Sequence, residues 1–144
     1  MAVMPDYFHN NDSPTENYGD WFNGWLKDNT SWEDCQKDLD NAMTYARRNG
    51  AKKFVTVGFC WGAWAVFHAC QSKDFLGGAS FHPSVVNIGN CFDPVETGSD
   101  LASKIVCPQL LCPTKDEDKS QGYHPSKEDN TIWNILNENF ADKF

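Results

Sequence analysis

The residue with the clearest chemical potential in this chain is Cys60, which lies between two glycines at Gly58 and Gly62. Cysteine is a nucleophile as its thiolate, and a thiolate is favoured where helix N–H groups point toward it. The spacing Gly-x-Cys-x-Gly, between a strand and a helix, is typical of a nucleophile held on a sharp turn. The glycines would let the strand and helix approach closely. We therefore expect acyl-transfer chemistry at Cys60; the structural alternative is a small side chain that only fills space in a turn.

The elements that must position Cys60 follow from the residues on either side of it. A β-branched and aromatic run predicts a buried strand at 53–58, and an apolar run predicts a helix at 61–72. The amide N–H of Trp61 would then belong to the first turn of that helix and could stabilise a developing oxyanion. This context is what the Gly-x-Cys-x-Gly motif requires.

A thiol nucleophile also needs a base, usually histidine, and a group that orients the base. The acidic loop after the predicted strand at 105–112 offers three carboxylates, of which Asp116 comes soonest after the strand and is our first choice. Glu117 and Asp118 are close rivals. An acidic loop is otherwise simply a solvated segment, so this assignment depends on Cys60.

The histidines fit the role of base less well. His124 is the histidine that follows the acidic loop, but no strand-like segment lies between residues 118 and 144, so we expect it in a surface loop. His82 ends a predicted strand at 77–82, beside the nucleophile strand. We expect His82 to line the pocket, and its structural alternative is a hydrogen-bonded histidine at a strand terminus.

Strand and helix patterns alternate along the chain. Helices are predicted at 31–49, at 61–72 and from Ser126 or Asp129 onward, with a turn-rich stretch at 86–103. Such alternation favours parallel strands with right-handed crossovers, which is an α/β layered fold. Because working groups gather at the carboxyl ends of parallel strands, Cys60, His82 and the acidic loop should meet at one edge of the sheet.

Composition narrows the class of protein further. The chain has 144 residues, which suits one domain, and its net charge of −8 argues against nucleic acid and anionic membrane surfaces as partners. We also find no long apolar run of membrane-spanning length and no secretory signal pattern. The six cysteines and four histidines complete no zinc spacing, so we expect no metal or other cofactor. Reduced thiols in the cytoplasm are the expected state.

Several segments in order along the chain resemble the dienelactone hydrolase (carboxymethylenebutenolidase) family, in particular its eukaryotic branch. They are Met-Pro-Asp-Tyr-Phe at 4–8, Asp-Leu-Asp-Asn-Ala-Met-Thr-Tyr-Ala-Arg at 38–47, Val-Gly-Phe-Cys-Trp-Gly-Ala at 57–63, Gly-Ala-Ser-Phe-His-Pro-Ser at 78–84 and Cys-Pro-Gln-Leu-Leu at 107–111. The resemblance implies an α/β-hydrolase-like three-layer fold with a mostly parallel sheet. It also implies a Cys-Asp-His triad that hydrolyses small lactones or esters without a metal.

Carried over residue by residue, the resemblance makes Cys60 the nucleophile and the Trp61 amide an oxyanion donor, and it places the acid near Asp116. The family also has strands before the Pro-Asp-Tyr-Phe segment and a final strand with a His-Gly loop that delivers the base, and we find neither pattern here. We therefore expect one partial domain over 1–144, incomplete at its N- and C-termini.

Two functions are compatible with that partial pattern. The first is a hydrolase of small lactones or esters acting through Cys60, impaired because the triad histidine is not evident. The second is a non-catalytic α/β module that acts through binding, with self-association a candidate because missing strands would expose apolar faces.

Overall fold

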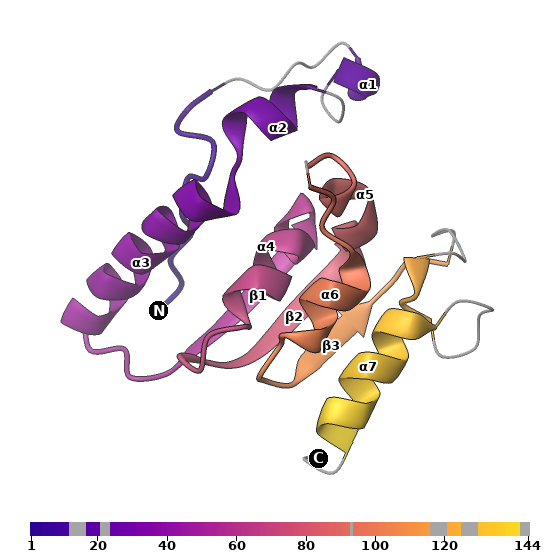
Figure 1. The fold of residues 1–144 in the computed structure, drawn as a ribbon. Coiled ribbons are helices and arrows are strands. Elements are labelled where there is room, and N and C mark those ends of the chain that lie inside the picture. The colour runs from indigo at the N-terminus through magenta and orange to yellow at the C-terminus, as the bar shows by residue number, and fades with distance from the viewer. Residues whose placement is uncertain (12–16, 21–23, 93, 116–120, 125–129, 142–144) are drawn as a thin grey trace. The chain divides into compact units, whose positions relative to one another are not determined.

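The computed structural model describes residues 1–11, 17–20, 24–92, 94–115, 121–124 and 130–141 (Figure 1). Contacts between residues divide the chain into two compact units, Met1–Lys52 and Lys53–Phe144.

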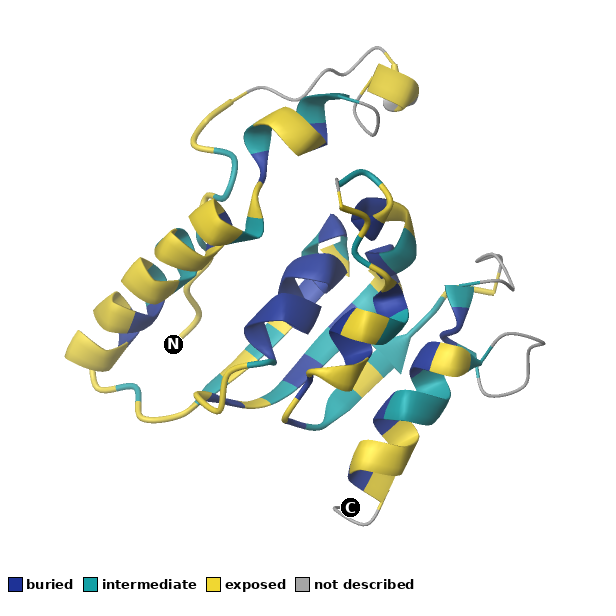
Figure 2. Ribbon diagram, viewed as in Figure 1, coloured by how far each residue is buried: buried dark blue, intermediate teal, exposed yellow. Residues whose placement is uncertain are grey.

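The first unit is built on helix α3 (Trp32–Arg48), which follows two short helices, α1 (Tyr18–Asp20) and α2 (Leu26–Asn29). The apolar residues of α3 recur at helical spacing, and Cys35, Met43 and Ala46 are buried along one stripe (Figure 2). Ser31 is the N-cap residue, since its side chain accepts a hydrogen bond from the Asp34 amide.

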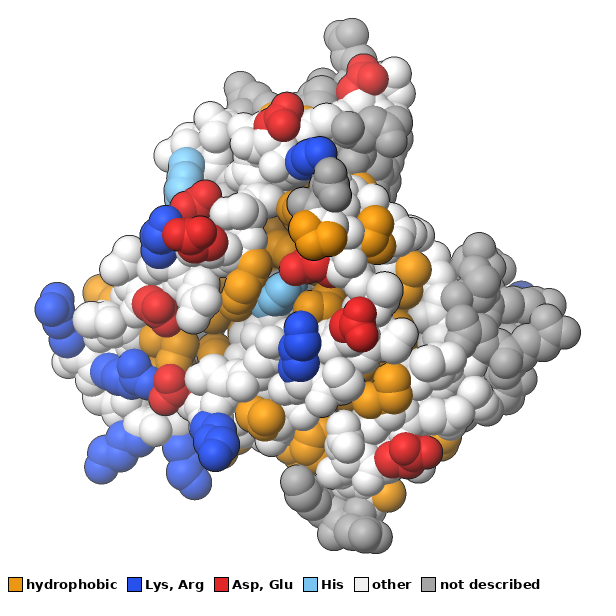
Figure 3. Space-filling view, in the orientation of Figure 1, with side chains coloured by type: hydrophobic (Ala, Val, Ile, Leu, Met, Phe, Trp, Pro, Cys, Tyr) orange, Lys and Arg blue, Asp and Glu red, His pale blue; other side chains and the backbone are white. Residues whose placement is uncertain are grey.

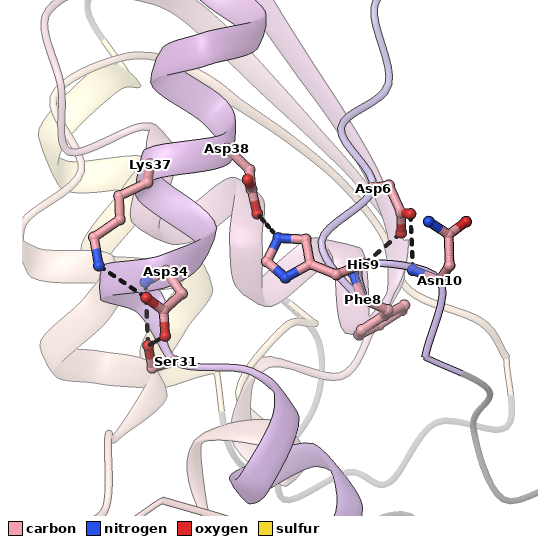
Figure 4. A network of polar contacts seen from close by, with 8 residues as sticks. All are labelled: Asp6, Phe8, His9, Asn10, Ser31, Asp34, Lys37 and Asp38. Atoms are coloured by element: carbon pink, nitrogen blue, oxygen red, sulfur yellow. Dashed lines mark hydrogen bonds and ion pairs between the residues drawn. The ribbon is translucent and has the colours of Figure 1, made fainter.

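A tight turn precedes these helices and is fixed by polar contacts (Figure 4). The Asp6 carboxylate accepts hydrogen bonds from the amides of Phe8 and Asn10, at 3.2 and 3.0 Å. His9 and Asn10 adopt positive φ angles there, and His9 Nε2 lies 2.7 Å from Asp38 Oδ2 on α3. The contact between His9 and Asp38 thereby attaches the turn to α3.

The second unit contains a three-stranded parallel sheet in the order β1-β2-β3, formed by Phe54–Cys60, Phe75–Pro83 and Gln109–Cys112. Helix α4 (Trp61–Ala69) connects β1 to β2 and packs against both strands (Figure 1). Helices α5 (Val85–Gly89) and α6 (Gly98–Ser103) connect β2 to β3, and α7 (Thr131–Phe140) contacts α6. This is the α/β class that the sequence predicts.

Helix α4 lies at the centre of the core. Eight of its nine residues are buried, with Ala63 and Phe67 at 0% exposure (Figure 2). A helix that is apolar on all sides must be covered on all sides, and here the sheet and helices α5 and α6 contact it. Strands β1 and β2 therefore both pack against the same buried helix.

The sheet face that does not meet α4 has a different character. On β1, Val55, Val57 and Phe59 are 71%, 58% and 66% exposed, and they alternate with residues that are less exposed. Leu76 on β2 and Leu110 on β3 are also more than half exposed. Parallel sheets are usually covered on both faces, so this apolar outer face is unusual.

The described elements differ from the sequence expectations at their ends and, for β1, in burial, because only Gly58 of the seven residues of this expected buried strand is buried. β1 continues through Cys60 rather than stopping at 58, and β3 is limited to Gln109–Cys112. The turn-rich stretch at 86–103 contains parts of two short helices, α5 and α6, which were not predicted. Helices of five and six residues carry too little periodicity to be recognised in a sequence.

Charged side chains lie on the surface, and acidic groups occur across the face that Figure 3 shows. In the part of the chain that the structure describes, no helix is long and apolar enough to cross a membrane.

A partly buried polar cluster attaches the segment before α6 to α4. Glu96 Oε2 accepts a hydrogen bond from Trp64 Nε1 at 2.8 Å and lies 3.1 Å from His68 Nε2. Phe92 stacks on the Trp64 ring, with centroids 5.1 Å apart. Burial raises the pKa of Glu96, but the hydrogen bonds from His68 and Trp64 and the charges of His68 and Lys104 together outweigh burial, so the net pKa is lowered.

We predict that Glu96 stabilises the fold only where it is ionised. A carboxyl group with a lowered folded pKa contributes stability that is present above its ordinary value of 4.5 and lost as the pH falls through the folded value. Urea unfolding of the wild type and Glu96→Gln between about pH 3 and 7 should show a difference in unfolding free energy that shrinks toward acid. The exposed Glu138→Gln is the control. A Glu96→Gln difference that is constant with pH would contradict this prediction.

Candidate functional site

The chain reverses sharply at Cys60, which is the last residue of β1 and the N-cap of α4. Its backbone has φ 51° and ψ −112°. A positive φ angle in a residue with a side chain costs about 1–3 kcal/mol and is retained only where the surrounding structure imposes it. Here β1 and α4, both fixed in the core, join at this one residue.

Gly58 makes this reversal sterically possible. A Cβ atom at position 58 would lie 2.1 Å from the carbonyl oxygen of Gly62, far inside van der Waals contact. The strand and the first turn of α4 therefore touch through backbone atoms. Gly62 has a different environment, since a Cβ atom there would meet nothing within 4 Å. The expectation that both glycines are needed for close approach is thus correct for Gly58 and wrong for Gly62.

The Cys60 side chain is partly exposed and has a polar neighbour. Its Sγ lies 3.4 Å from Oγ of Ser84, and the Ser84 amide donates a 3.4 Å hydrogen bond to the Cys60 carbonyl oxygen. Ser84 is buried, with 7% exposure. Sequence reasoning missed Ser84, although its place just beyond the end of a predicted strand was a usable signal.

A bulge separates His82 from this pair. The register runs from Phe59 opposite Phe81 to Cys60 opposite Pro83, so β2 has one residue in excess, His82. His82 has φ 50° and is exposed, and the rings of Phe59 and Phe81 stack beside it with centroids 5.1 Å apart. Two residues with positive φ thus lie at the carboxyl ends of neighbouring strands, Cys60 as the last residue of β1 and His82 as the last but one of β2.

The other predicted site residues are placed as follows. Trp61 is buried at the start of α4, where a helix has amide groups without carbonyl partners inside the helix. Asp116 and its rivals Glu117 and Asp118 lie outside the described residues. Among the described residues, no group of three His, Cys, Asp or Glu side chains is arranged to hold a metal ion.

His124 lines a cavity of about 440 Å³ between β3 and α7, together with Leu110, Tyr123 and Trp133. Its Nε2 atom is buried and has no hydrogen-bond partner among the described residues. Cys60 does not line this cavity, so the cavity and the thiol are separate features of the second unit.

The remaining five cysteines provide an internal comparison. Cys35, Cys70 and Cys107 are buried, and burial raises the pKa of each thiol, to about 12 for Cys35. Burial also raises the pKa of Cys91. Cys112, at the end of β3, is partly exposed like Cys60, and it is therefore the matched thiol for experiments on Cys60.

The site is thus a cysteine at the carboxyl end of a parallel strand, where the chain reverses into a helix. In α/β folds, catalytic and binding groups gather at this edge of the sheet. Comparison with known proteins agrees with this class. The family model "Dienelactone hydrolase family" matches residues 1–128, so the chain belongs to the dienelactone hydrolase family.

Two curated relatives are proteins described as "Carboxymethylenebutenolidase homolog", from Homo sapiens and Pongo abelii. Each is 31% identical over 85 residues, which cover 56% of this chain and 34% of the relative. The match therefore spans about a third of the length of these relatives. No solved structure matches the chain.

We predict that alanine at the two glycines will have opposite consequences. Gly58→Ala forces a Cβ atom against the Gly62 carbonyl oxygen and should lower the unfolding free energy by about 2 kcal/mol or more. Gly62→Ala adds a methyl group in open space within a helix and should be neutral or up to about 1 kcal/mol stabilising. Denaturant unfolding of both variants tests this, and equal destabilisation by the two would contradict the close contact.

Proposed function

We propose that this chain is a hydrolase of small lactones or esters in which Cys60 is the nucleophile. The observation that carries the proposal is the backbone of Cys60, held at positive φ between the end of β1 and the start of α4. The energetic cost of that conformation is typical of functional positions. Membership of the dienelactone hydrolase family supports the same class of reaction.

In the proposed reaction, the Cys60 thiolate attacks the carbonyl carbon and forms an S–C bond. The carbonyl oxygen becomes an oxyanion, which the Trp61 amide at the start of α4 stabilises. The tetrahedral intermediate then breaks its C–O bond, and the alkoxide or enolate leaves and takes up a proton. Water hydrolyses the thioester, which releases the carboxylic acid and restores the thiol. These steps require no metal or other cofactor.

The proton-transfer groups are the incomplete part of this proposal. Asp116 is the proposed orienting acid, with Glu117 and Asp118 as alternatives, and His82 is proposed to line the pocket. In the sheet register Pro83 stands opposite Cys60, and His82 is the extra residue of the bulge beside it. His124 lies outside the sheet and lines the cavity between β3 and α7. The cytoplasmic location expected from the sequence stays a prediction.

We predict that hydrolysis of p-nitrophenyl acetate by the full chain depends on Cys60. Cys60→Ala should lower the rate to that of buffer, since no second described thiol lies at a strand-to-helix reversal. Cys112→Ala, which removes the matched thiol at the end of β3, should keep the wild-type rate. The measurement is initial release of p-nitrophenolate at several enzyme concentrations.

Equal rates for the wild type and Cys60→Ala would reject the nucleophile assignment. Asp116→Asn, Glu117→Gln and Asp118→Asn, assayed in the same way, identify the acid as the carboxylate whose loss reduces the rate most.

A second candidate function is binding without catalysis, favoured by the apolar outer face of Val55, Val57 and Phe59. Exposed apolar faces of this kind are typical of protein–protein contact. The proposed occupant is a second copy of the chain, which carries the same apolar face and would cover it in a twofold pair. Equilibrium sedimentation should then show a dimer in the wild type that Val57→Lys dissociates; a monomeric wild type would reject it.

A further inference from the structure

Ser84 has an uncommon arrangement for a serine at the start of a helix. It is the N-cap residue of α5, yet its side chain makes no capping hydrogen bond. Serine is favoured at N-caps because its oxygen usually accepts a hydrogen bond from the second or third amide of the helix. The Ser84 hydroxyl therefore does not make the capping hydrogen bond that its position predicts.

Tyr123 takes over the capping role. Its phenol oxygen accepts a 3.1 Å hydrogen bond from the amide of Val86, the second residue of α5. Tyr123 is 2% exposed and comes from a segment 37 residues further along the chain. The amide that an N-cap serine would ordinarily satisfy thus has a partner from elsewhere in the fold.

The Ser84 hydroxyl is consequently left for Cys60. The Oγ–Sγ distance is 3.4 Å, within reach of an O–H···S hydrogen bond, and Ser84 is buried. The backbone holds the pair in place, because the Ser84 amide donates to the Cys60 carbonyl oxygen and the Ser84 carbonyl accepts from Ile88 at 2.9 Å. Either atom can donate while the sulfur is a thiol, but only the hydroxyl can donate to a thiolate, so a hydroxyl at this distance stabilises the thiolate.

We propose that Ser84 is a positioning residue for Cys60, whose hydroxyl donates a hydrogen bond to the thiolate, and that Tyr123 permits this by capping α5 in its place. The consequence for catalysis rests on the proposed function. The hydrogen bond itself does not, because it acts on the acidity of the thiol whether or not an ester is turned over.

Other titratable groups stand on the elements around Cys60. They are His68 on α4, with Glu96 bonded to it, His82 at the end of β2 and Cys112 at the end of β3. Substitutions at Ser84 and Tyr123 leave all of these side chains unchanged. A change in Cys60 acidity in those variants can therefore be assigned to the serine hydroxyl.

The test is the pH dependence of Cys60 alkylation by iodoacetamide, followed by peptide mass spectrometry with Cys112 as the internal reference. Ser84→Ala should make alkylation of Cys60 about tenfold slower at neutral pH, because less of the reactive thiolate is present, and leave it equally fast at a pH high enough to ionise every exposed thiol. Ser84→Thr, which keeps the hydroxyl, should retain the wild-type profile. The exposed Ser103→Ala is a control without effect.

Tyr123→Phe tests the second half of the proposal. Without the phenol oxygen, the Val86 amide should draw the Ser84 hydroxyl toward α5, and the Cys60 profile should shift in the same direction as in Ser84→Ala. The double variant should shift no further than Ser84→Ala alone. An unchanged Cys60 profile in a Ser84→Ala protein with the wild-type melting temperature would overturn the proposal. So would a Ser84→Thr profile that matches Ser84→Ala.

These outcomes are separable from a failure of the proposed function. A chain that does not hydrolyse p-nitrophenyl acetate but shows the Ser84-dependent alkylation profile loses the enzymatic assignment and keeps the hydrogen bond. A chain that hydrolyses the ester through Cys60 with no Ser84 dependence keeps the enzyme and loses this role for Ser84.

Discussion

The reversal of the chain at Cys60 is the constraint on which the site depends. β1 and α4 join without a connecting loop, so one residue must absorb the whole change of direction, and Cys60 does so at positive φ. The contact between Gly58 and the Gly62 carbonyl oxygen shows how little space is left. Because α4 is buried on nearly every side, this geometry cannot relax by a shift of the helix.

The surroundings of Cys60 depend on the same constraint. The carboxyl end of β2 lies beside it, and the bulge at His82 advances that strand by one residue, which brings Pro83 opposite Cys60 and Ser84 against its sulfur. Tyr123 then satisfies the helix amide that Ser84 does not. The Ser84 hydroxyl thus reaches the Cys60 sulfur, and the Tyr123 phenol, from a third part of the chain, contacts the helix that Ser84 begins.

The second unit also has two faces of unlike character. One face of the sheet is covered by α4 and its neighbours, and the other carries the exposed apolar residues of β1 (Figure 2). Burial of apolar surface is the main stabilising term in folding. A parallel sheet covered on one face therefore buries less apolar surface than the parallel sheets of most α/β proteins, which are covered on both faces. The aligned part of the chain covers about a third of each curated relative, which accords with so partial a sheet.

Local patterns were sufficient to predict the α/β class, the strand before Cys60, the helix after it and helix α3. These features depend on residue type and on the spacing at which apolar residues recur, every two residues in a strand and every 3.6 in a helix. Both can be read from the sequence itself. The short helices α5 and α6 were missed for the opposite reason, since five or six residues do not complete a recognisable period. The position of the acid among Asp116, Glu117 and Asp118 stays a prediction.

The sequence by itself determined that a cysteine stands between a strand and a helix, because glycine spacing and apolar runs are properties of neighbouring residues. Only the tertiary structure decided that Gly58 is sterically required while Gly62 is not, that His82 is the extra residue of a bulge, and that Ser84 faces the sulfur. The bulge and the contact of Ser84 with Cys60 follow from the pairing of β1 with β2, and the Gly58 contact follows from the angle at which the core holds α4 against β1. No local pattern encodes which backbone atoms such segments will bring together.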